Sequence, residues 1–281
     1  IFICNPVIFD ALEESISKGD EGLSGGVNVL AQRNKMRYLR LADNFWIDID
    51  DKTDLKNAER ILCFKLKKDT DGPVSRILNR PISLMISKAL LKTGITPNQI
   101  SVLSCVIGLA GASLFFFGEY FYLILGGIIV HIHSIVDGCD GEIARLKLRR
   151  TKYGGYLDSF LDRYVDAAII LGLTYGYWSI SGDSTIWIMG FAAIIGSFIN
   201  TYTGEKYDSI FKIGNGTGRI KFRVGRDVRL LIIVVGALTN QIPILLIIVA
   251  VLANFEAIRR LILFRNKLGY DVNDMHREFA N

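Results

Sequence analysis

The sequence predicts an all-α polytopic membrane protein with six transmembrane helices, an interfacial amphipathic helix and a small cytoplasmic α/β segment at the N-terminus. Hydrophobic residues make up 50% of the 281 residues and the mean hydropathy is +0.32, which is too apolar for an ordinary soluble protein. Charged residues still make up 22%, and they are dense before residue 75, whereas long apolar runs begin near residue 99. We therefore expect a charged segment of residues 1–68, a linker of residues 69–97 and a membrane domain of residues 98–281.

The first segment has the pattern of part of an α/β domain. Apolar spacing predicts a helix over residues 5–18, and residues 36–41 and 45–49 have the pattern of strands. Residues 50–53 then supply capping side chains for a helix that begins at residue 54 and ends near residue 65.

The linker contains a candidate interfacial helix. Residues 73–94 mix apolar side chains with the basic residues Arg76, Arg80, Lys88 and Lys92. This pattern is typical of an amphipathic helix that lies in the membrane interface, although a helix packed on a soluble domain has the same spacing.

Six apolar segments follow, which we predict to be transmembrane helices. Several hold fewer than twenty apolar residues because the ends that we place on the cytoplasmic side are polar. Their approximate ranges are 98–117, 120–145, 153–180, 185–205, 227–240 and 242–264.

The charges that flank these segments predict their orientation. Lys and Arg are abundant after the second and fourth segments and in the tail, whereas the connections at residues 118–119, 181–184 and 240–241 contain none. By the positive-inside rule, both termini and the basic loops face the cytoplasm. This topology accounts for the net charge of +5, so we expect no nucleic-acid partner.

Four aspartates lie at the cytoplasmic ends of the second and third segments. Asp137 and Asp140 are three residues apart and Asp158 and Asp162 are four apart, so each pair points to one face of a helix. A turn near residues 147–153 would bring the two faces together. Four carboxylates in one place repel each other unless cations lie between them, and ionisable groups at a membrane boundary indicate a functional site. Oxygen ligands suit Mg²⁺, Mn²⁺ or Ca²⁺, and a pair of such ions is the usual arrangement for displacement at phosphorus.

Small residues recur on the same helix faces, which pairing of the acids with nearby arginines would not explain. Gly141, Ala144 and Gly154 leave room for a helix or a ligand to approach the backbone. With the four acids and Arg145 they form the pattern Asp-x2-Asp-Gly-x2-Ala-Arg-x8-Gly-x3-Asp-x3-Asp over residues 137–162. This pattern resembles the signature of CDP-alcohol phosphotransferases, with no signature position missing.

The resemblance implies an integral membrane enzyme, a homodimer, that moves a substituted phosphate from a CDP-alcohol to an acceptor alcohol or lipid and releases CMP. It implies that Asp137, Asp140, Asp158 and Asp162 hold one or two ions, Mg²⁺ or Mn²⁺, and that Ca²⁺ can occupy the same site. Asp162 matches the family's last aspartate and would take the proton of the acceptor hydroxyl. The residues implied to bind CDP are Asp137, Gly141, Ala144, Arg145, Gly154 and Asp158. Asp166 lies outside the signature, and we expect it either to support the acids of the site or to be structural.

A basic loop follows the fourth segment. It contains Gly214-Asn-Gly-Thr-Gly and several basic residues that are candidates for binding an acceptor phosphate. A flexible connection and the positive-inside rule explain the same residues equally well. The candidate acceptor or phosphate ligands are Arg219, Lys221, Arg223 and Arg226.

The histidines and cysteines are not expected to bind metal. His131 and His133 are two residues apart and face different directions on a helix, which favours packing or interface roles. The cysteines have no paired spacing, so the sequence predicts neither a disulfide framework nor a zinc site. They are Cys4, Cys63, Cys105 and Cys139.

Residues 45–50, followed by the helix from residue 54, resemble the C-terminal part of sugar-phosphate nucleotidyltransferases. In that family the aspartate matching Asp48 can hold a metal. The family's Gly-rich nucleotide-binding loop occurs nowhere in this chain, so we expect this fragment to be inactive alone. Some bifunctional enzymes make CDP-inositol in such a soluble domain and consume it in a membrane domain, which suggests a polar alcohol by analogy.

Two other classes of protein use helix-borne acids in membranes. Intramembrane prenyltransferases bind Mg²⁺ and a diphosphate, but their aspartate motifs lie on separate halves of the chain. Cation transporters usually place their acids near the bilayer midplane at broken helices. Here both pairs lie on adjacent segments at the cytoplasmic ends, which favours the phosphotransferase.

Overall fold

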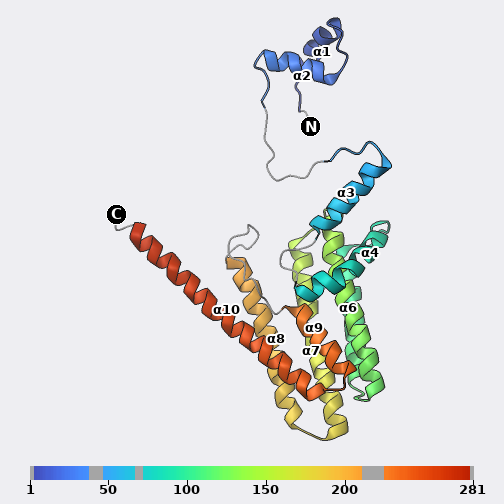
Figure 1. The fold of residues 1–281 in the computed structure, drawn as a ribbon, viewed down its shortest axis with the longest axis vertical. Helices are drawn as coiled ribbons and strands as arrows, with labels where there is room; N and C mark the ends of the chain where they lie inside the picture. The colour runs from blue at the N-terminus through green and yellow to red at the C-terminus, as the bar shows by residue number, and fades with distance from the viewer. Residues whose placement is uncertain (1–2, 38–46, 67–71, 211–224, 279–281) are drawn as a thin grey trace. The chain divides into compact units, whose positions relative to one another are not determined.

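The computed structural model describes residues 3–37, 47–66, 72–210 and 225–278 (Figure 1). Within these ranges it contains ten α-helices, one π-helix and no strand. The chain divides into two compact units, Ile1–Leu55 and Lys56–Asn281, each of which is described by itself.

The first unit is a helical hairpin of α1 (Val7–Ser17) and α2 (Leu23–Gln32). The two helices pack through Ile8, Ala11, Val29 and Leu30. The helix predicted over residues 5–18 is confirmed, but α2 was not predicted, because its Gly25-Gly26 pair has low helix propensity. A Cβ atom at Gly26 would lie 2.7 Å from Leu12, so tight packing on α1 explains this glycine.

The predicted strands fall largely outside the described residues, because residues 38–46 are not among them. Residues 36–37 and 47–49, which are described, have no regular secondary structure. The α/β character of the N-terminal segment therefore stays a prediction.

Two helices precede the membrane bundle in the sequence. Helix α3 (Lys52–Lys65) confirms the prediction for residues 54–65, and the Asp51 carboxylate accepts hydrogen bonds from the backbone N–H groups of Thr53 (2.6 Å) and Asp54 (2.8 Å) at its start. The helix predicted over residues 73–94 is also present, as a π-helical turn, Ser75–Asn79, that continues into α4 (Arg80–Leu91).

Helix α4 buries polar side chains and exposes apolar ones. Arg80, Ser83 and Ser87 are buried, whereas Ile82 and Met85 are exposed. This reverses the usual pattern of a helix in a soluble protein and supports contact with lipid.

Six helices form the membrane domain (Figure 1). They are α5 (Pro97–Phe115), α6 (Tyr120–Leu146), α7 (Lys152–Ser181), α8 (Thr185–Ile210), α9 (Arg226–Leu238) and α10 (Ile242–Glu278). Of these, α5, α6, α8 and α10 are long and apolar enough to cross a membrane. Helix α7 has 30 residues but carries charges along its first half, and α9 has only 13 residues. The chain is thus a helical polytopic membrane protein, and six crossings remain a prediction.

Glycines allow α5 and α7 to lie in close contact. A Cβ atom at Gly172 would lie 2.6 Å from the Ala112 carbonyl oxygen, and one at Gly176 would lie 2.0 Å from that of Phe115. Small residues at such contacts are typical of membrane helix packing. Helix α5 also packs against α6, so one helix supports both of the helices that carry the predicted site.

Candidate active site

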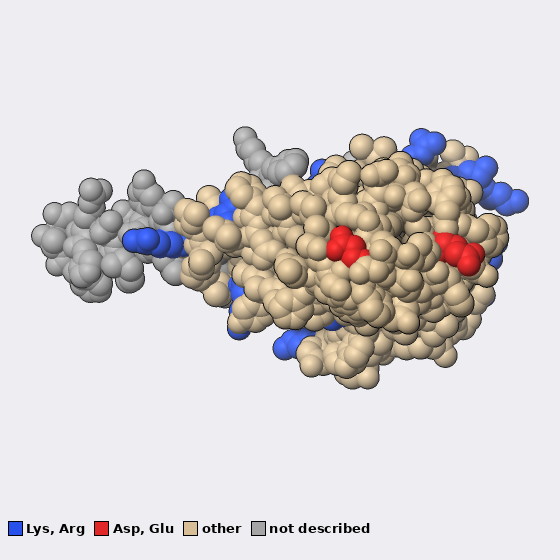
Figure 2. Space-filling model, turned by 90° about the horizontal axis from the view of Figure 1, so that it is seen from below, with Lys and Arg blue, Asp and Glu red and all other residues tan. Residues whose placement is uncertain are grey.

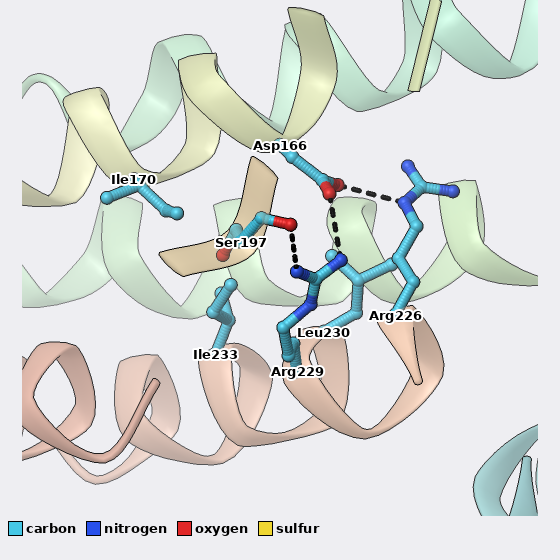
Figure 3. A pocket seen from close by; sticks show the side chains of 7 residues that line it. All are labelled: Asp166, Ile170, Ser197, Arg226, Arg229, Leu230 and Ile233. Atoms are coloured by element: carbon cyan, nitrogen blue, oxygen red, sulfur yellow. Dashed lines mark hydrogen bonds and ion pairs between the residues drawn. The ribbon is translucent and has the colours of Figure 1, made fainter. Parts of the chain in front are cut away.

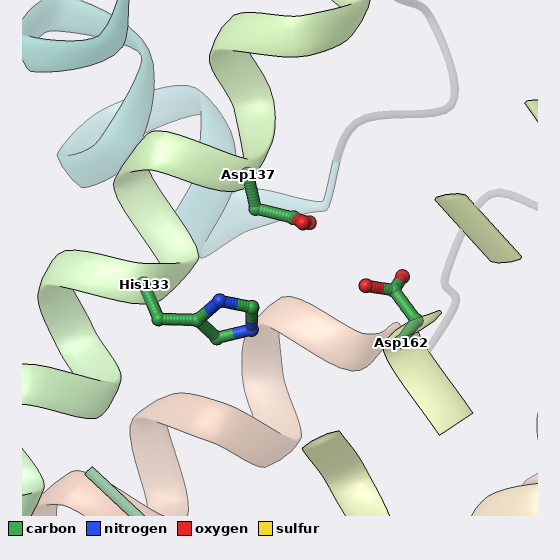
Figure 4. A group of neighbouring side chains, drawn as sticks. All are labelled: His133, Asp137 and Asp162. Atoms are coloured by element: carbon green, nitrogen blue, oxygen red, sulfur yellow. The ribbon is translucent and has the colours of Figure 1, made fainter. Parts of the chain in front are cut away.

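The four aspartates predicted from the sequence come together where α6 and α7 face each other. The turn between the helices ends at Thr151, whose hydroxyl accepts a hydrogen bond from the Gly154 N–H (2.9 Å) and caps α7. Carboxylate oxygens of Asp137 and Asp162 and a ring nitrogen of His133 all lie within 4.8 Å of one another (Figure 4). Asp140 and Asp158, on the same two helices, lie close enough to Asp137 to interact with it electrostatically.

Serines from α5 hold the acids of α6 in place. The Ser104 hydroxyl donates to Asp137 (3.1 Å), and the Ser101 hydroxyl donates to Asp140. Both acceptors are carboxylates, so these bonds are stronger than bonds between neutral groups. Neither serine was predicted, because nothing in the α5 sequence reveals which face meets the acids.

Arg226 lies in the middle of this cluster. Its guanidinium contacts Asp137 (2.9 Å), Asp162 (2.8 Å) and Asp166 (2.9 Å), and its second terminal nitrogen lies 2.9 Å from Nε2 of His133. Arg226 was predicted to be a phosphate ligand in the basic loop, and in the structure it lies among the acids. Arg219, Lys221 and Arg223, the other candidates in that loop, lie outside the described residues.

A second arginine of α9 also contacts Asp166 (Figure 3). Arg229 contacts the Asp166 carboxylate (3.3 Å) and donates to the Ser197 carbonyl oxygen (2.8 Å). These residues line a small pocket with Ile170, Leu230 and Ile233. Asp166 is therefore neutralised by two arginines of α9, which agrees with a structural role.

The cluster has the chemistry of a cation site. Its carboxylates are only 7% to 22% exposed, and partly buried acids of this number require positive charge beside them. A guanidinium supplies that charge in the structure. Carboxylate oxygens are also the ligands that Mg²⁺, Mn²⁺ and Ca²⁺ prefer, so the residues fit a divalent cation.

The signature's small residues border the acids. The Gly141 N–H donates to the Asp140 carboxylate. A Cβ atom at Gly154 would lie 3.0 Å from the Asn98 side chain, so this glycine allows a close approach. Ala144 and Arg145 lie on the last turn of α6, half-buried.

On its opposite face, α6 is held against α4 by a buried acid that was not predicted. Glu142 is fully buried and accepts hydrogen bonds from Arg80 (2.5 Å), Ser83 (2.7 Å) and Ser87 (2.7 Å) of α4. Its only sequence signal is the spacing of these three α4 residues, which places them on one helix face. Lys147 then joins the end of α6 to the linker through the carbonyl oxygen of Thr93 (2.8 Å). Helix α4 thereby sets the rotation at which α6 presents Asp137 and Asp140.

Comparison with known proteins decides what kind of site this is. The sequence profile of the CDP-alcohol phosphatidyltransferase family matches residues 94–253, which include α5, α6, α7, α8 and α9. The chain belongs to this family. The matched residues include the whole acid motif, and the family predicted from that motif is confirmed.

Two curated relatives extend the comparison. The chain is 34% identical over 272 residues to the bifunctional IPC transferase and DIPP synthase of Aquifex aeolicus, covering 95% of this chain and 61% of that protein. It is 33% identical over 175 residues to the archaetidylinositol phosphate synthase of Pyrococcus horikoshii, covering 62% of this chain and 86% of that protein. The chain therefore spans about three fifths of the bifunctional relative, and the match includes the N-terminal segment that resembles nucleotidyltransferases.

Solved structures show the same fold. Phosphatidylinositol phosphate synthase of Mycobacterium tuberculosis with CDP-DAG bound is similar with a TM-score of 0.54 and 26% identity, covering 64% of this chain and 92% of that chain. The same enzyme in complex with manganese and citrate gives a TM-score of 0.53 and 25% identity, covering 64% and 87%.

Proposed function

We propose that this chain transfers an inositol-phosphate group from a CDP-alcohol to an inositol-phosphate acceptor. The observation that supports the proposal is the convergence of Asp137, Asp140, Asp158 and Asp162 in one acidic cluster. The names of the relatives supply the substrate class, since archaetidylinositol phosphate and phosphatidylinositol phosphate both contain an inositol-phosphate group. Because the bifunctional relative matches 95% of the chain, we assign CDP-inositol as the donor and CDP-diacylglycerol as the alternative.

The residues have distinct roles in this reaction. The four aspartates would hold Mg²⁺, as one or two ions, with Mn²⁺ as the alternative. The bound metal would neutralise the charge of the donor diphosphate. Gly141, Ala144 and Gly154 would let cytidine lie close to the backbone, and Arg145, on the same end of α6, would approach a phosphate.

Asp162 is assigned as the general base. It takes the proton of the acceptor hydroxyl as the hydroxyl oxygen forms a bond to the donor's substituted phosphorus, while the bond from that phosphorus to the CMP oxygen breaks. A base of this kind contributes roughly 10²–10⁴-fold to the rate. Arg226 and the basic residues before it provide positive charge for the phosphate of the acceptor.

The proposed topology places the site on the cytoplasmic side. The acids lie at the ends of α6 and α7 that adjoin the basic turn 147–152, and the opposite connections carry no Lys or Arg. Seen from below the view of Figure 1, the molecule is largely uncharged, with acidic side chains and no Lys or Arg near its centre (Figure 2). Six crossings, both termini in the cytoplasm and a homodimer complete this proposal.

The test is CMP release by the purified full chain from CDP-inositol, CDP-glycerol or CDP-diacylglycerol, each offered inositol phosphate or a lipid alcohol, with Mg²⁺ or with EDTA. We expect Mg²⁺-dependent CMP release from CDP-inositol with inositol phosphate. Asp162→Asn should lower the rate by at least ~10²-fold. Asp183→Asn, in the connection between α7 and α8, is the matched control and should leave the rate unchanged. CMP release only from CDP-diacylglycerol would overturn the assignment of CDP-inositol as the donor. No CMP release from any pair would overturn the proposed reaction.

A further inference from the structure

His133 contributes a nitrogen donor to a cluster otherwise made of carboxylates. It lies one turn before Asp137 on α6, and only 1% of it is exposed. Figure 4 shows its ring beside the space that Asp137 and Asp162 face from opposite sides. The three donor atoms lie within 4.8 Å of one another, close enough to share one ion.

The hydrogen bonds of the ring assign its tautomer. Nδ1 lies 2.8 Å from the backbone carbonyl oxygen of Ser104, which can only accept, so Nδ1 carries the hydrogen. Nε2 then holds a lone pair, and this lone pair faces the Arg226 guanidinium at 2.9 Å. A ring N–H bonded to a backbone carbonyl is the usual support of a metal-binding histidine.

Helix α5 holds the ring in this position. The Ser104 hydroxyl lies 2.9 Å from Nδ1 and 3.1 Å from a carboxylate oxygen of Asp137, so one serine orients the side chains of both His133 and Asp137. A Cβ atom at Gly108 would lie 3.0 Å from the ring, so the absence of a side chain there makes room for the imidazole. Nε2 of His133 is therefore held in place as an electron-pair donor, and it already contacts a cationic group, the Arg226 guanidinium.

We propose that His133 is a nitrogen ligand of the divalent cation, bound with Asp137 and Asp162 in the place that the Arg226 guanidinium takes in the structure. This inference rests on the proposed function of the same site and deepens it. An imidazole donor suits later transition metals, so it favours Co²⁺, and to a smaller degree Mn²⁺, over Mg²⁺ and Ca²⁺, which prefer oxygen. His133 is thereby a residue that determines metal specificity.

The experiment is electron spin echo modulation spectroscopy of Mn²⁺ bound to the full chain in detergent, with and without [¹⁵N]histidine labelling. We expect a ¹⁴N modulation from a bound imidazole, replaced by a ¹⁵N pattern in the labelled protein. His133→Gln should abolish it. His131→Gln, two residues away on α6, and His276→Gln should not, so the signal is assigned to His133 even where His133→Gln fails to fold.

Metal affinity provides a second readout. His133→Gln should weaken Mn²⁺ binding at least ~10-fold and Mg²⁺ binding by a smaller factor. Bound Mn²⁺ without nitrogen modulation, a modulation that persists in His133→Gln, or no Mn²⁺ binding would each overturn the assignment. CMP release with Mg²⁺ is measured on the same preparations: if it persists, only the ligand assignment fails, and if it is absent, the proposed function fails as well.

Discussion

Arg226 determines the electrostatics of the site at the scale of single residues. It contacts three carboxylates from α6 and α7, although it is separated from them by about sixty or more residues of chain. Because a guanidinium and a metal ion are both cations, the two compete for Asp137 and Asp162. The same residue is therefore expected to stabilise the fold and to oppose metal binding.

We predict that Arg226→Gln lowers the stability of the chain without added metal. The change leaves several partly buried acids without their cation, and breaking such a pair costs on the order of 3 kcal/mol. Mg²⁺ or Mn²⁺ should restore much of the loss by binding the folded state. The measurement is the melting temperature in detergent with EDTA and with each metal.

Arg163→Gln is the matched control for this substitution. Arg163 pairs with Glu205, which is 55% exposed, so its loss should cost no more than about 1 kcal/mol and should not respond to metal. Equal losses for the two variants, or a loss in Arg226→Gln that metal does not relieve, would contradict the role given to Arg226.

At the scale of elements, α4 supports the helix that carries the first acid pair. The Glu142–Arg80 pair is buried on both sides, with 0% and 6% of the two side chains exposed. Replacing one member leaves the other charge buried without a partner, whereas replacing both with apolar residues leaves no unpaired buried charge. This difference provides a test of whether the Glu142–Arg80 pair holds α4 against α6.

We predict that Glu142→Ala destabilises the chain by about 3–5 kcal/mol and lowers activity, because Arg80 stays buried and α6 loses its support. The double variant Arg80→Met/Glu142→Ala should be more stable than Glu142→Ala, and Arg80→Met alone completes the cycle. A double-mutant cycle of thermal stability measures this coupling. Additive losses would show that the two residues act independently.

The α5–α7 contact gives a second prediction at this scale. Gly176→Ala should cost about 1–3 kcal/mol, since the new methyl group would overlap the Phe115 carbonyl oxygen and force the helices apart. Gly155→Ala, on the same helix but with nothing within 4 Å, should be neutral or stabilising by up to about 1 kcal/mol. Melting temperatures compare the two, and equal effects would argue against close packing as the cause.

At the scale of the whole molecule, the membrane domain follows closely from its sequence. The acid pairs could be placed because spacings of three and four fix one helix face, and the short turn at 147–151 keeps the adjoining ends of α6 and α7 close together. Contacts that arise from distant parts of the chain could not be placed in this way. Arg226, Ser101 and Ser104 enter the site from other helices, and helical spacing does not record which helices become neighbours.

His133 shows the same limit. Its distance from His131 correctly indicates that the two rings point in different directions, and this argued against a site formed by both. What the sequence does not display is that one ring meets acids from two helices. In the first unit, the Gly25-Gly26 pair concealed α2, because the packing that favours those glycines is tertiary.

The arginine among the acids also bears on how the protein is made. Membrane helices with unbalanced acids are costly to assemble, yet here the balancing charge is encoded in the polypeptide and arrives with α9. The bundle can therefore close as soon as its last helices are synthesised, before any divalent ion is acquired. We expect cells starved of divalent metal to accumulate normal amounts of the protein with little activity. Metal supply would then control the activity of the protein and not its amount.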